Sequence, residues 1–523
     1  MRCVVPAAFG GDPWPAWHSS WRDRGGNRPA GVKRRVLAAL LWAGLASPAF
    51  AQPSTLTIGL REDPDVLDPT LGSAYVSRIV YASLCDKLID IDAGLNLVPQ
   101  LATAWEYEDP THLVLHLRPG VVFNDGEPFN AEAVRYKVHR DATIKGSMRA
   151  GEVVDPLTVR LVLKAPSSPL LSQLADRAGI MISPKAAEAG DFGSYPVCAG
   201  PYAFESRVAQ DSIVLRRFAR HWDAANYHFD RIVFRPLPNS SVRLANLQAG
   251  SLDLVEYILP SDVEAVQRDP KLKIAIGDGL TYQGITFNTD NGPAADTALG
   301  RNRLVRQAFE RAIDRIALNQ VVYGGLFSPT AQANPESSPF FVPAVQPPPR
   351  DLERARALLN EAGVTPPVPV TLTLPNSPDV QQTAEVIQAM VAEAGFDLKL
   401  RVMEFASSLQ AGYGGEFQAY LIGWSGRSDP DGNVWQQLHT GGTFNYGHWT
   451  SPAADALLDQ ARIPSDVAAR RALYAKLWGV ERADLPLLYL WTAKNVVGMK
   501  RGLAGFVQVP DGLIRLRGVT LAR

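Results

Sequence analysis

Apolar and polar residues follow each other in two distinct periods along this chain. Residues 55–60, TLTIGL, alternate with a period of two, and residues 155–166, 369–377 and 396–404 contain similar runs rich in Val, Leu and Thr. A period of two places successive side chains on opposite faces, which is typical of β-strands. We therefore expect strands in these four ranges.

A second set of segments repeats its apolar residues every three to four positions. The clearest is residues 302–325, in which the apolar positions 304, 305, 308, 309, 312, 313, 316 and 317 form one stripe. Residues 351–363 and 386–395 repeat the pattern. Asn130 stands where it would cap another helix, with Glu132 in its first turn. The sequence predicts helices in these segments, including one continuous helix over most of 302–325.

The order of these elements predicts the fold class. Strand, helix and strand alternate over residues 369–404, which is typical of sheets covered by helices. At 523 residues the chain is too long for one ordinary domain, so we expect two or three hydrophobic cores. We interpret the proline-rich residues 335–349 as an extended strap across a surface rather than a flexible linker. The predicted class is α/β.

The N-terminal residues resemble an export signal. In residues 33–52, KRRVLAALLWAGLASPAFAQ, three basic residues precede an apolar run that ends in small residues. The run is shorter than the roughly 20 residues that span a bilayer. We therefore expect cleavage after Ala51 and a periplasmic location, with an uncleaved membrane anchor as the alternative. Residues 1–31 fit no signal pattern, and we interpret them as a mis-assigned start, with translation beginning near Val32.

Composition and charge narrow the function classes. Apolar residues make up 46% of the chain and charged residues 20%, as in ordinary soluble globular proteins. Beyond residue 51 the net charge is about −6, and a mildly acidic body offers no basic surface for nucleic acid. This part keeps two cysteines, Cys85 and Cys198. In an oxidising compartment they either form a disulfide or remain two buried free thiols.

Motifs of catalysis and metal binding are scarce. The sequence contains no H-E-x-x-H, no P-loop and no G-x-S-x-G. His112 and His116 share a face of a predicted strand, but no cysteine or carboxylate stands at ligand spacing. Residues 288–296 lack the final glutamate of a calcium loop. We expect no catalytic residue, no metal and no cofactor. A secreted hydrolase stays an alternative, since spacing alone does not identify or dismiss a carboxylate pair.

One short stretch combines several kinds of chemistry with flexible backbone. GWSGRSDPDG, residues 423–432, places a tryptophan, two serines, an arginine and two aspartates between glycines. It follows the predicted strand end AYLI, residues 419–422. A catalytic loop, a metal loop and a ligand-binding loop all fit this composition.

Several segments together resemble one known family. They are LVPQLATAWEYEDPTHLVLHLRPGVVFNDGEPFNAEAVRY (97–136), PVCAGPYAF (196–204), LVRQAFERAIDR (304–315), DLERARALLNEAG (351–363), the stretch 423–432 and DLPLLYLW (484–491). In this order the chain resembles the extracellular solute-binding proteins of ABC transporters, family 5, which includes dipeptide-, oligopeptide- and nickel-binding proteins.

The resemblance implies a two-lobed periplasmic binding protein clamp of type II. It implies lobe I at residues 52–279 with an extra subdomain at about 84–199, lobe II at 280–490, and a C-terminal return to lobe I at 491–523. YQGITFN (282–288) and LPLLYLW (485–491) are implied to be the crossing strands. The ligand would bind between the lobes and be buried when they close.

In the relatives the loop after this strand faces the ligand, which implies contacts from Trp424, with Ser425 and Asp429 beside it. Dipeptide-binding relatives carry an aspartate here that pairs with the ligand's α-ammonium group, whereas this chain has Arg427. A buried guanidinium repels an ammonium group. Either Arg427 pairs with a ligand carboxylate or phosphate, or it forms an internal bridge with Asp429 or Asp431.

Position along the chain suggests three further contacts: Tyr75 before the first predicted helix, and Asn445 and Tyr446 after the loop. The implied function is the capture of a small polar solute, which is a peptide, peptide-like or anionic. The protein is implied to act as a monomer and to bind the solute without any covalent chemistry. Lobe closure would precede delivery to an inner-membrane ABC permease with its ATPase. A ligand receptor for a sensor or chaperone role on the same fold is the other alternative.

Overall fold

The computed structural model describes residues 54–72, 74–141, 144–463 and 466–522. The chain divides into two compact units, Met1–Gln52 and Pro53–Arg523, and the described residues all belong to the second. The expected signal peptide, its cleavage after Ala51 and the start near Val32 lie outside the described residues. Within them, no helix is long and apolar enough to cross a lipid bilayer.

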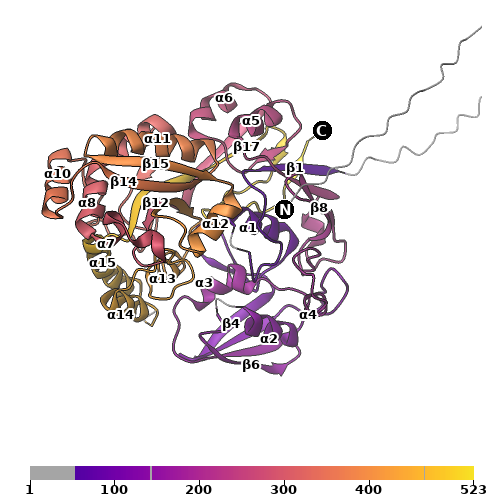
Figure 1. The fold of residues 1–523 in the computed structure, drawn as a ribbon. Helices are drawn as coiled ribbons and strands as arrows, with labels where there is room; N and C mark the ends of the chain where they lie inside the picture. Colours follow the sequence, from indigo (N-terminus) through magenta and orange to yellow (C-terminus); the bar gives the residue numbers. More distant parts are fainter. Residues whose placement is uncertain (1–53, 73, 142–143, 464–465, 523) are drawn as a thin grey trace, which may run out of the picture. The chain divides into compact units, whose positions relative to one another are not determined.

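A large mixed sheet forms the centre of the fold (Figure 1). Among the described residues its strands lie in the order β15 (Phe396–Met403), β14 (Val368–Pro375), β16 (Ala419–Trp424), β12 (Leu272–Phe287), β17 (Leu487–Lys500), β11 (Leu254–Val255), β1 (Thr55–Leu60), β10 (Arg231–Pro236), β9 (Ser212–Arg217) and β8 (Tyr202–Val208). β13 (Ser328–Pro329) pairs with β17 beside this path. β14 is parallel to β15, as the strand–helix–strand pattern predicts.

Two long antiparallel strands, β12 and β17, join the two halves of this sheet. Leu272–Asp278 pairs with Lys500–Lys494, and Tyr282–Thr286 pairs with Thr492–Leu487. The register shifts between these two ladders, so the pairing is interrupted where one half passes into the other. We call the half with β11, β1, β10, β9 and β8 lobe I and the half with β16, β14 and β15 lobe II. The expected two-lobed α/β fold is confirmed.

Five helices pack around a large hydrophobic core of lobe II that includes Phe287, Phe309 and Leu421. Among the described residues they are α7 (Ala298–Arg301), α8 (Arg303–Ala312), α9 (Arg315–Tyr323), α10 (Leu352–Glu361) and α11 (Pro378–Ala392). α12 (Phe405–Tyr413) contacts β14, α14 (Pro452–Ala461) contacts α13 (Asp431–Leu438), and α15 (Val467–Asp484) contacts α14. The proline-rich residues 335–349 contain no helix or strand. Phe340 of this segment packs in a second core, as expected of a strap.

The single helix predicted over residues 302–325 is wrong, because the structure divides it into α8 and α9. Ile313 lies between them in extended backbone. The Asp314 side chain accepts hydrogen bonds from two backbone N–H groups in the first turn of α9, at 2.9 and 3.0 Å. Capping satisfies amide groups that a helix start leaves without partners, and here the cap divides a continuous apolar stripe.

Lobe I carries a separate antiparallel sheet in the order β4 (Ala102–Asp109), β5 (His112–Leu117), β7 (Thr158–Leu163) and β6 (Met148–Asp155), drawn in purple in Figure 1. α2 (Ala131–Arg140) contacts this sheet through β6 and β7. Asn130 caps α2 as predicted, since its side chain accepts a hydrogen bond from the Ala133 N–H at 3.1 Å. The sheet and α2 lie inside the range expected for the extra subdomain, residues 84–199.

The remaining helices and strands of lobe I are short. They are α1 (Tyr75–Leu84), α3 (Leu170–Leu174), α4 (Pro184–Glu188), α5 (Ser240–Gln248), α6 (Val263–Arg268), the pair β2 (Ile89–Ile91) and β3 (Leu97–Pro99), and the pair β18 (Leu503–Ala504) and β19 (Thr520–Leu521). The pair β18 and β19 belongs to the C-terminal residues, which pack in the core of lobe I through Leu503 and Val519.

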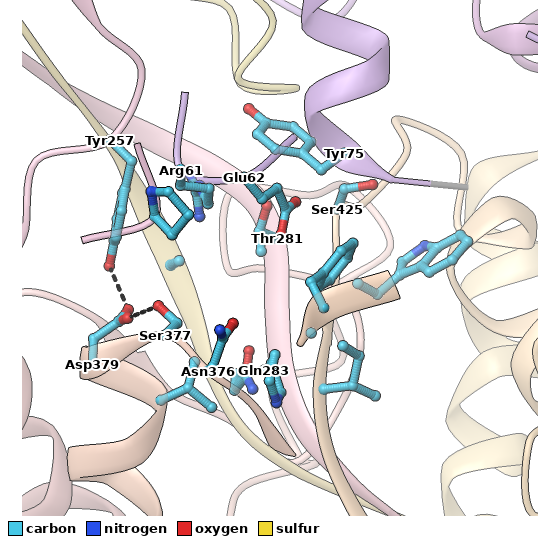
Figure 2. Close-up of a pocket in the computed structure, with 18 of the residues that line it drawn as sticks. Arg61, Glu62, Tyr75, Tyr257, Thr281, Gln283, Asn376, Ser377, Asp379 and Ser425 are labelled. Atoms are coloured by element: carbon cyan, nitrogen blue, oxygen red, sulfur yellow. Dashed lines mark hydrogen bonds between the residues drawn. The ribbon is translucent and has the colours of Figure 1, made fainter. Parts of the chain in front are cut away.

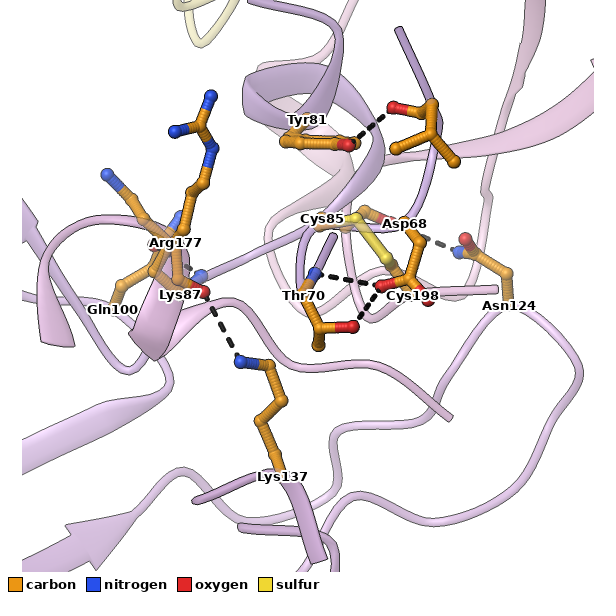
Figure 3. Close-up of a disulfide and its surroundings, with 12 residues drawn as sticks. Asp68, Thr70, Tyr81, Cys85, Lys87, Gln100, Asn124, Lys137, Arg177 and Cys198 are labelled. Carbon is orange, nitrogen blue, oxygen red and sulfur yellow. Dashed lines mark hydrogen bonds between the residues drawn. A yellow bond between two sulfur atoms is a disulfide. The ribbon is translucent and has the colours of Figure 1, made fainter. Parts of the chain in front are cut away.

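A disulfide joins the two chain segments that enter and leave the range 84–199 (Figure 3). Cys85, directly after α1, is bonded to Cys198, and 113 positions separate them. Of the two alternatives that the sequence left open, the structure has the bonded one. Gly200 lies at the same crossing, where a Cβ atom would meet the Leu84 carbonyl oxygen at 2.4 Å. This close approach of two backbones requires glycine.

Candidate functional site

A cavity of about 250 Å³ is lined by residues of both lobes (Figure 2). Its polar side chains are Arg61, Glu62, Asp63, Gln210 and Arg243 from lobe I, Thr281 and Gln283 from β12, and Asn376, Ser377, Asp379, Glu404 and Ser425 from lobe II. Because both lobes surround the same space, a change in their separation changes its exposure to solvent. Such a space between two hinged lobes suits a small ligand.

Two arginines of lobe I line the cavity, and they differ in their hydrogen-bond partners. Arg61, directly after β1, donates to both carboxylate oxygens of Glu256 at 2.9 and 2.7 Å. Burial lowers the pKa of Arg61, but Glu256 outweighs burial and the net effect is a raised pKa. Arg243 of α5 donates to two backbone carbonyl groups and has no carboxylate within ion-pair distance among the described residues. Its positive charge is therefore left for another partner.

Four acidic side chains among the described residues line the cavity, and three of them have partners. Asp63 pairs with an arginine of β8 at 3.1 Å. Asp379 accepts hydrogen bonds from two hydroxyl groups, drawn as dashed lines in Figure 2. Glu404 accepts from an N–H group in the first turn of α12 at 2.9 Å. The fourth, Glu62, has neither a hydrogen-bond nor an ion-pair partner within the described part of the chain.

Aromatic side chains form one wall of the cavity. The Trp424 ring, at the end of β16, lies 4.8 Å from the Phe444 ring centroid, and Tyr446 lies 6.3 Å from Phe444. Trp424 Nε1 donates to the carbonyl of Gly432 at 2.9 Å, which fixes the indole. Rings held in this way offer apolar surface and stacking at little entropic cost.

The loop after β16, residues 425–430, has a fixed backbone. Gly426 has a φ of 59°, and a Cβ atom there would meet the Leu280 carbonyl oxygen at 2.0 Å, so the loop requires glycine at this position. The Asn433 side chain accepts from the Arg427 N–H at 2.6 Å and donates to the Arg427 carbonyl at 2.9 Å. The glycines of this stretch therefore serve close packing rather than flexibility.

Both aspartates of this stretch pair with arginines of lobe II, and Asp431 also accepts a hydrogen bond from the Gln173 side chain of lobe I at 3.4 Å. The two oxygens of Asp429 accept from Nη1 and Nη2 of Arg470 at 2.7 Å each. Asp431 pairs with Arg462 at 3.1 Å. The predicted bridge from Arg427 to Asp429 or Asp431 is therefore wrong. Asp429 also lies outside the cavity lining, because a buried ion pair occupies both of its oxygens.

Arg427 extends across to lobe I instead. Its Nε lies 2.5 Å from Asp176 Oδ2, and Arg78 Nε lies 2.9 Å from Asp176 Oδ1. Ser425 Oγ accepts hydrogen bonds from Arg427 at 2.9 Å and from Arg78 at 3.4 Å. The Arg427 guanidinium also lies 4.6 Å from the Trp424 ring centroid. These residues form an inter-lobe cluster, which we define as Arg78, Asp176, Ser425 and Arg427.

The charges of the inter-lobe cluster keep Asp176 ionised. Burial would raise the pKa of Asp176, but Arg427, Arg78 and Arg177 outweigh burial and hold this pKa well below its usual range. Burial and the neighbouring Arg78 lower the pKa of Arg427 to about 9, so its guanidinium is still charged at neutral pH. The single carboxylate of Asp176 thus interacts with the positive charges of three arginines.

The structure brings four of the seven predicted ligand contacts to the cavity. Trp424, Ser425, Tyr75 and Tyr446 line it. Arg427 and Asp429 do not, for the reasons given above. Asn445 does not either: its amide group donates to the carbonyl groups of residues 439 and 449, at 3.1 and 2.7 Å, and holds the loop around it.

Sequence reasoning missed Glu62 and Arg243. A signal for Glu62 was present, because it stands two positions after a strand that alternates clearly, and ligands of open α/β sheets bind beyond the carboxyl ends of strands. Arg243 sits in a helix of mixed composition and has no comparable signal. Among the described residues, no group of three or more His, Cys, Asp and Glu side chains is placed to hold a metal ion.

The chain is similar to proteins whose ligands are named. A glutathione-binding protein of Pectobacterium atrosepticum is 28% identical over 520 residues, which cover 94% of this chain and 99% of the relative. A periplasmic binding protein from Helicobacter pylori, solved with the peptide STSA, is 25% identical at a TM-score of 0.82, covering 90% of this chain and 98% of the other. The murein tripeptide-binding protein of Escherichia coli shares the fold, with a TM-score of 0.83 at 22% identity, and covers 90% and 99%.

A family model spans many of the elements that build the cavity. The model described as "Bacterial extracellular solute-binding proteins, family 5 Middle" matches residues 96–445, more than half of the chain. The matched range includes β12, β16, the loop after β16, and Trp424 and Phe444 of the aromatic wall, whereas Tyr446 and the lining residues 61–63 lie outside it. On this match the chain belongs to the bacterial extracellular solute-binding proteins of family 5.

Proposed function

We propose that this chain is the periplasmic substrate-binding component of an ABC importer and captures a short peptide or peptide-like solute. The observation that carries the proposal is the cavity between the lobes, which holds charged groups of lobe I opposite an aromatic wall of lobe II. The similarity to proteins named as glutathione- and peptide-binding supports this ligand class. Arg243, which has no carboxylate within ion-pair distance in the part of the chain that the structure describes, suits a ligand carboxylate.

The mechanism is binding with lobe closure, and no bond in the ligand is made or broken. The hinge lies where β12 and β17 change register, between Asp278 and Tyr282, near the proposed boundary between lobe I (52–279) and lobe II (280–490). The closed monomer then docks on an inner-membrane ABC permease, and the partner ATPase hydrolyses ATP. Closure removes water from the cavity, which strengthens charge-paired hydrogen bonds to the ligand.

A binding experiment tests this function. Native mass spectrometry of the exported protein is expected to show a bound mass in the range of a di- to tetrapeptide, and calorimetry with glutathione or trialanine is expected to give a dissociation constant of about 1 μM or below, about −8 kcal/mol. Absence of binding to any short peptide would reject the proposal. Release of hydrolysed peptide would favour a secreted hydrolase instead.

Export makes a separate prediction about the N-terminus. Signal peptidase is expected to cleave after Ala51, because small residues at Ala49 and Ala51 follow the apolar run. Intact-mass analysis of the periplasmic protein should then show a chain that begins at Gln52. A periplasmic or membrane-bound form that retains the apolar run would contradict the cleavage site.

A further inference from the structure

Glu62 stands out among the charged side chains of the cavity. It follows β1 at the edge of lobe I and lines the cavity. Its carboxylate has no hydrogen-bond or ion-pair partner within the described part of the chain, and no dashed line reaches it in Figure 2. The side chain is half-buried. A carboxyl group that is partly withdrawn from water and has no partner is unfavourable, so its presence in a ligand cavity calls for an explanation.

The neighbouring cations do not neutralise Glu62. Arg61 gives two hydrogen bonds to Glu256 and is committed to that carboxylate. Burial raises the pKa of Glu62 to about 8; Arg61 and Arg243 act against this rise, and Glu256 and Asp65 add to it. In lobe II, burial raises the pKa of Tyr420, and the charge of Glu62 adds to this rise. The surroundings of Glu62 therefore favour its neutral carboxyl group at pH 7.

Lobe II supplies no free carboxylate from the loop after β16. Asp429 is bound by Arg470, Asp431 is bound by Arg462, and Arg427 is itself a cation. A positive group of a ligand must therefore find its counter-charge elsewhere in the cavity. Of the four lining acids among the described residues, Glu62 has neither a hydrogen-bond nor an ion-pair partner, whereas Asp379 and Glu404 accept hydrogen bonds from neutral groups and Asp63 pairs with an arginine.

We propose that Glu62 receives the ammonium group of the ligand and makes this protein selective for solutes with a free amine. The proposal rests on the proposed capture of a peptide-like solute and specifies its recognition. Arg243, which also lines the cavity, then offers its positive charge to the carboxylate of the same ligand, and Trp424 with its aromatic neighbours offers apolar surface.

This role couples binding to a proton. An ammonium group stabilises the ionised carboxylate. A ligand that binds at pH 6.5 therefore displaces close to one proton from Glu62, whose pKa the protein raises to about 8. The affinity should rise about tenfold per pH unit between pH 6 and 7.5, because the unfavourable deprotonation becomes easier. Near pH 8 the rise ends, since the peptide's own α-amino group has a pKa of about 8.

The test compares trialanine with N-acetyl-trialanine on the wild type, on Glu62→Gln and on the control Glu385→Gln, whose residue lies exposed on α11. Calorimetry of the wild type at pH 7 is expected to show binding of trialanine at least about 30-fold tighter than of the acetylated form, the scale of a buried charge pair. Glu62→Gln should lose this preference and bind the acetylated peptide within about threefold of the wild type. Glu385→Gln should behave as the wild type.

Proton release gives a second readout that a structural role would not change. Titrations of trialanine in phosphate and in imidazole buffer at pH 6.5 should show release of about one proton from the wild type and almost none from Glu62→Gln. A Glu62→Gln protein that keeps both the amine preference and the proton release overturns the role of Glu62 and leaves the proposed function intact. A wild type that binds neither these two peptides nor glutathione overturns the proposed function, and the Glu62 proposal with it.

Discussion

Replacing Arg427 by alanine is expected to weaken peptide binding about 30- to 150-fold. Arg427 belongs to lobe II and Asp176 to lobe I, and they are 2.5 Å apart at their nearest charged atoms. Both side chains are largely buried, at 14% and 19% exposed. Removing one partner of such a pair costs about 2–3 kcal/mol, much of it from the charge left behind, and this free energy corresponds to the stated loss of affinity.

The effect is expected through the closed form rather than through ligand contact. An ion pair between lobes exists only while the lobes are together, so its loss shifts the population toward the open form. The apparent affinity of a ligand that needs the closed form then falls in proportion to the fraction of protein molecules in that form. The factor by which the affinity falls should therefore be the same for trialanine and for its C-terminal amide. A loss confined to the peptide with a free carboxylate would instead assign Arg427 to the ligand.

Arg462→Ala provides the matched control. The Arg462 side chain is 19% exposed and pairs with Asp431 of the same lobe. The nearby inter-lobe hydrogen bonds are made by the Arg462 carbonyl and by Gln173 with Asp431, so the substitution leaves their atoms in place. Calorimetry should show binding by Arg462→Ala within about threefold of the wild type, and small-angle scattering should show that peptide-loaded Arg427→Ala, but not Arg462→Ala, retains open molecules. Equal affinities of the two variants would contradict an inter-lobe role for Arg427.

The sequence predicted the fold well because its signals are local. Alternation over residues 55–60 and 369–377 corresponds to β1 and β14, and Asn130 caps α2 as its residue type and place indicate. The helix pattern over 302–325 failed at Ile313, because apolar periodicity does not register that Asp314 competes for the backbone amides of the next turn. Trp424 lines the cavity as expected, although β16 extends two residues beyond the predicted strand end at Ile422 and includes it.

The partners of the charged residues could not be predicted in the same way. Arg427 has two aspartates within four positions, yet it pairs with Asp176, 251 positions earlier in the chain. The nearby Asp429 is taken by Arg470 from α15. A fixed ion pair depends on which side chains the packed lobes bring together, and sequence distance carries little information about that. Likewise, the sequence does not show that Glu62 has no partner among the described residues. This can be recognised only when the structure gives the partners of the neighbouring charged residues.

Removal of the Cys85–Cys198 disulfide is expected to lower the free energy of unfolding by about 4 kcal/mol. The bond closes a loop across 113 positions, and a cross-link over roughly 100 residues restricts the unfolded chain by about 4–5 kcal/mol in the chain-entropy description. The closed range contains the four-stranded sheet and its own core. The loss should therefore fall on this subdomain first, while the core of lobe II keeps its stability.

Reduced wild type is the sharper comparison, because it keeps both sulfur atoms in the buried site whereas Cys85→Ala/Cys198→Ala also removes packed volume. Urea unfolding followed by hydrogen exchange should show earlier opening of residues 86–197 in both forms, with amides of α8 and α11 protected as in the oxidised protein. If the cross-link acts through the unfolded chain, the reduced protein accounts for most of the loss in the double variant. A reduced protein that unfolds at the same urea concentration as the oxidised one would show that packing, and not the bond, holds the subdomain to lobe I.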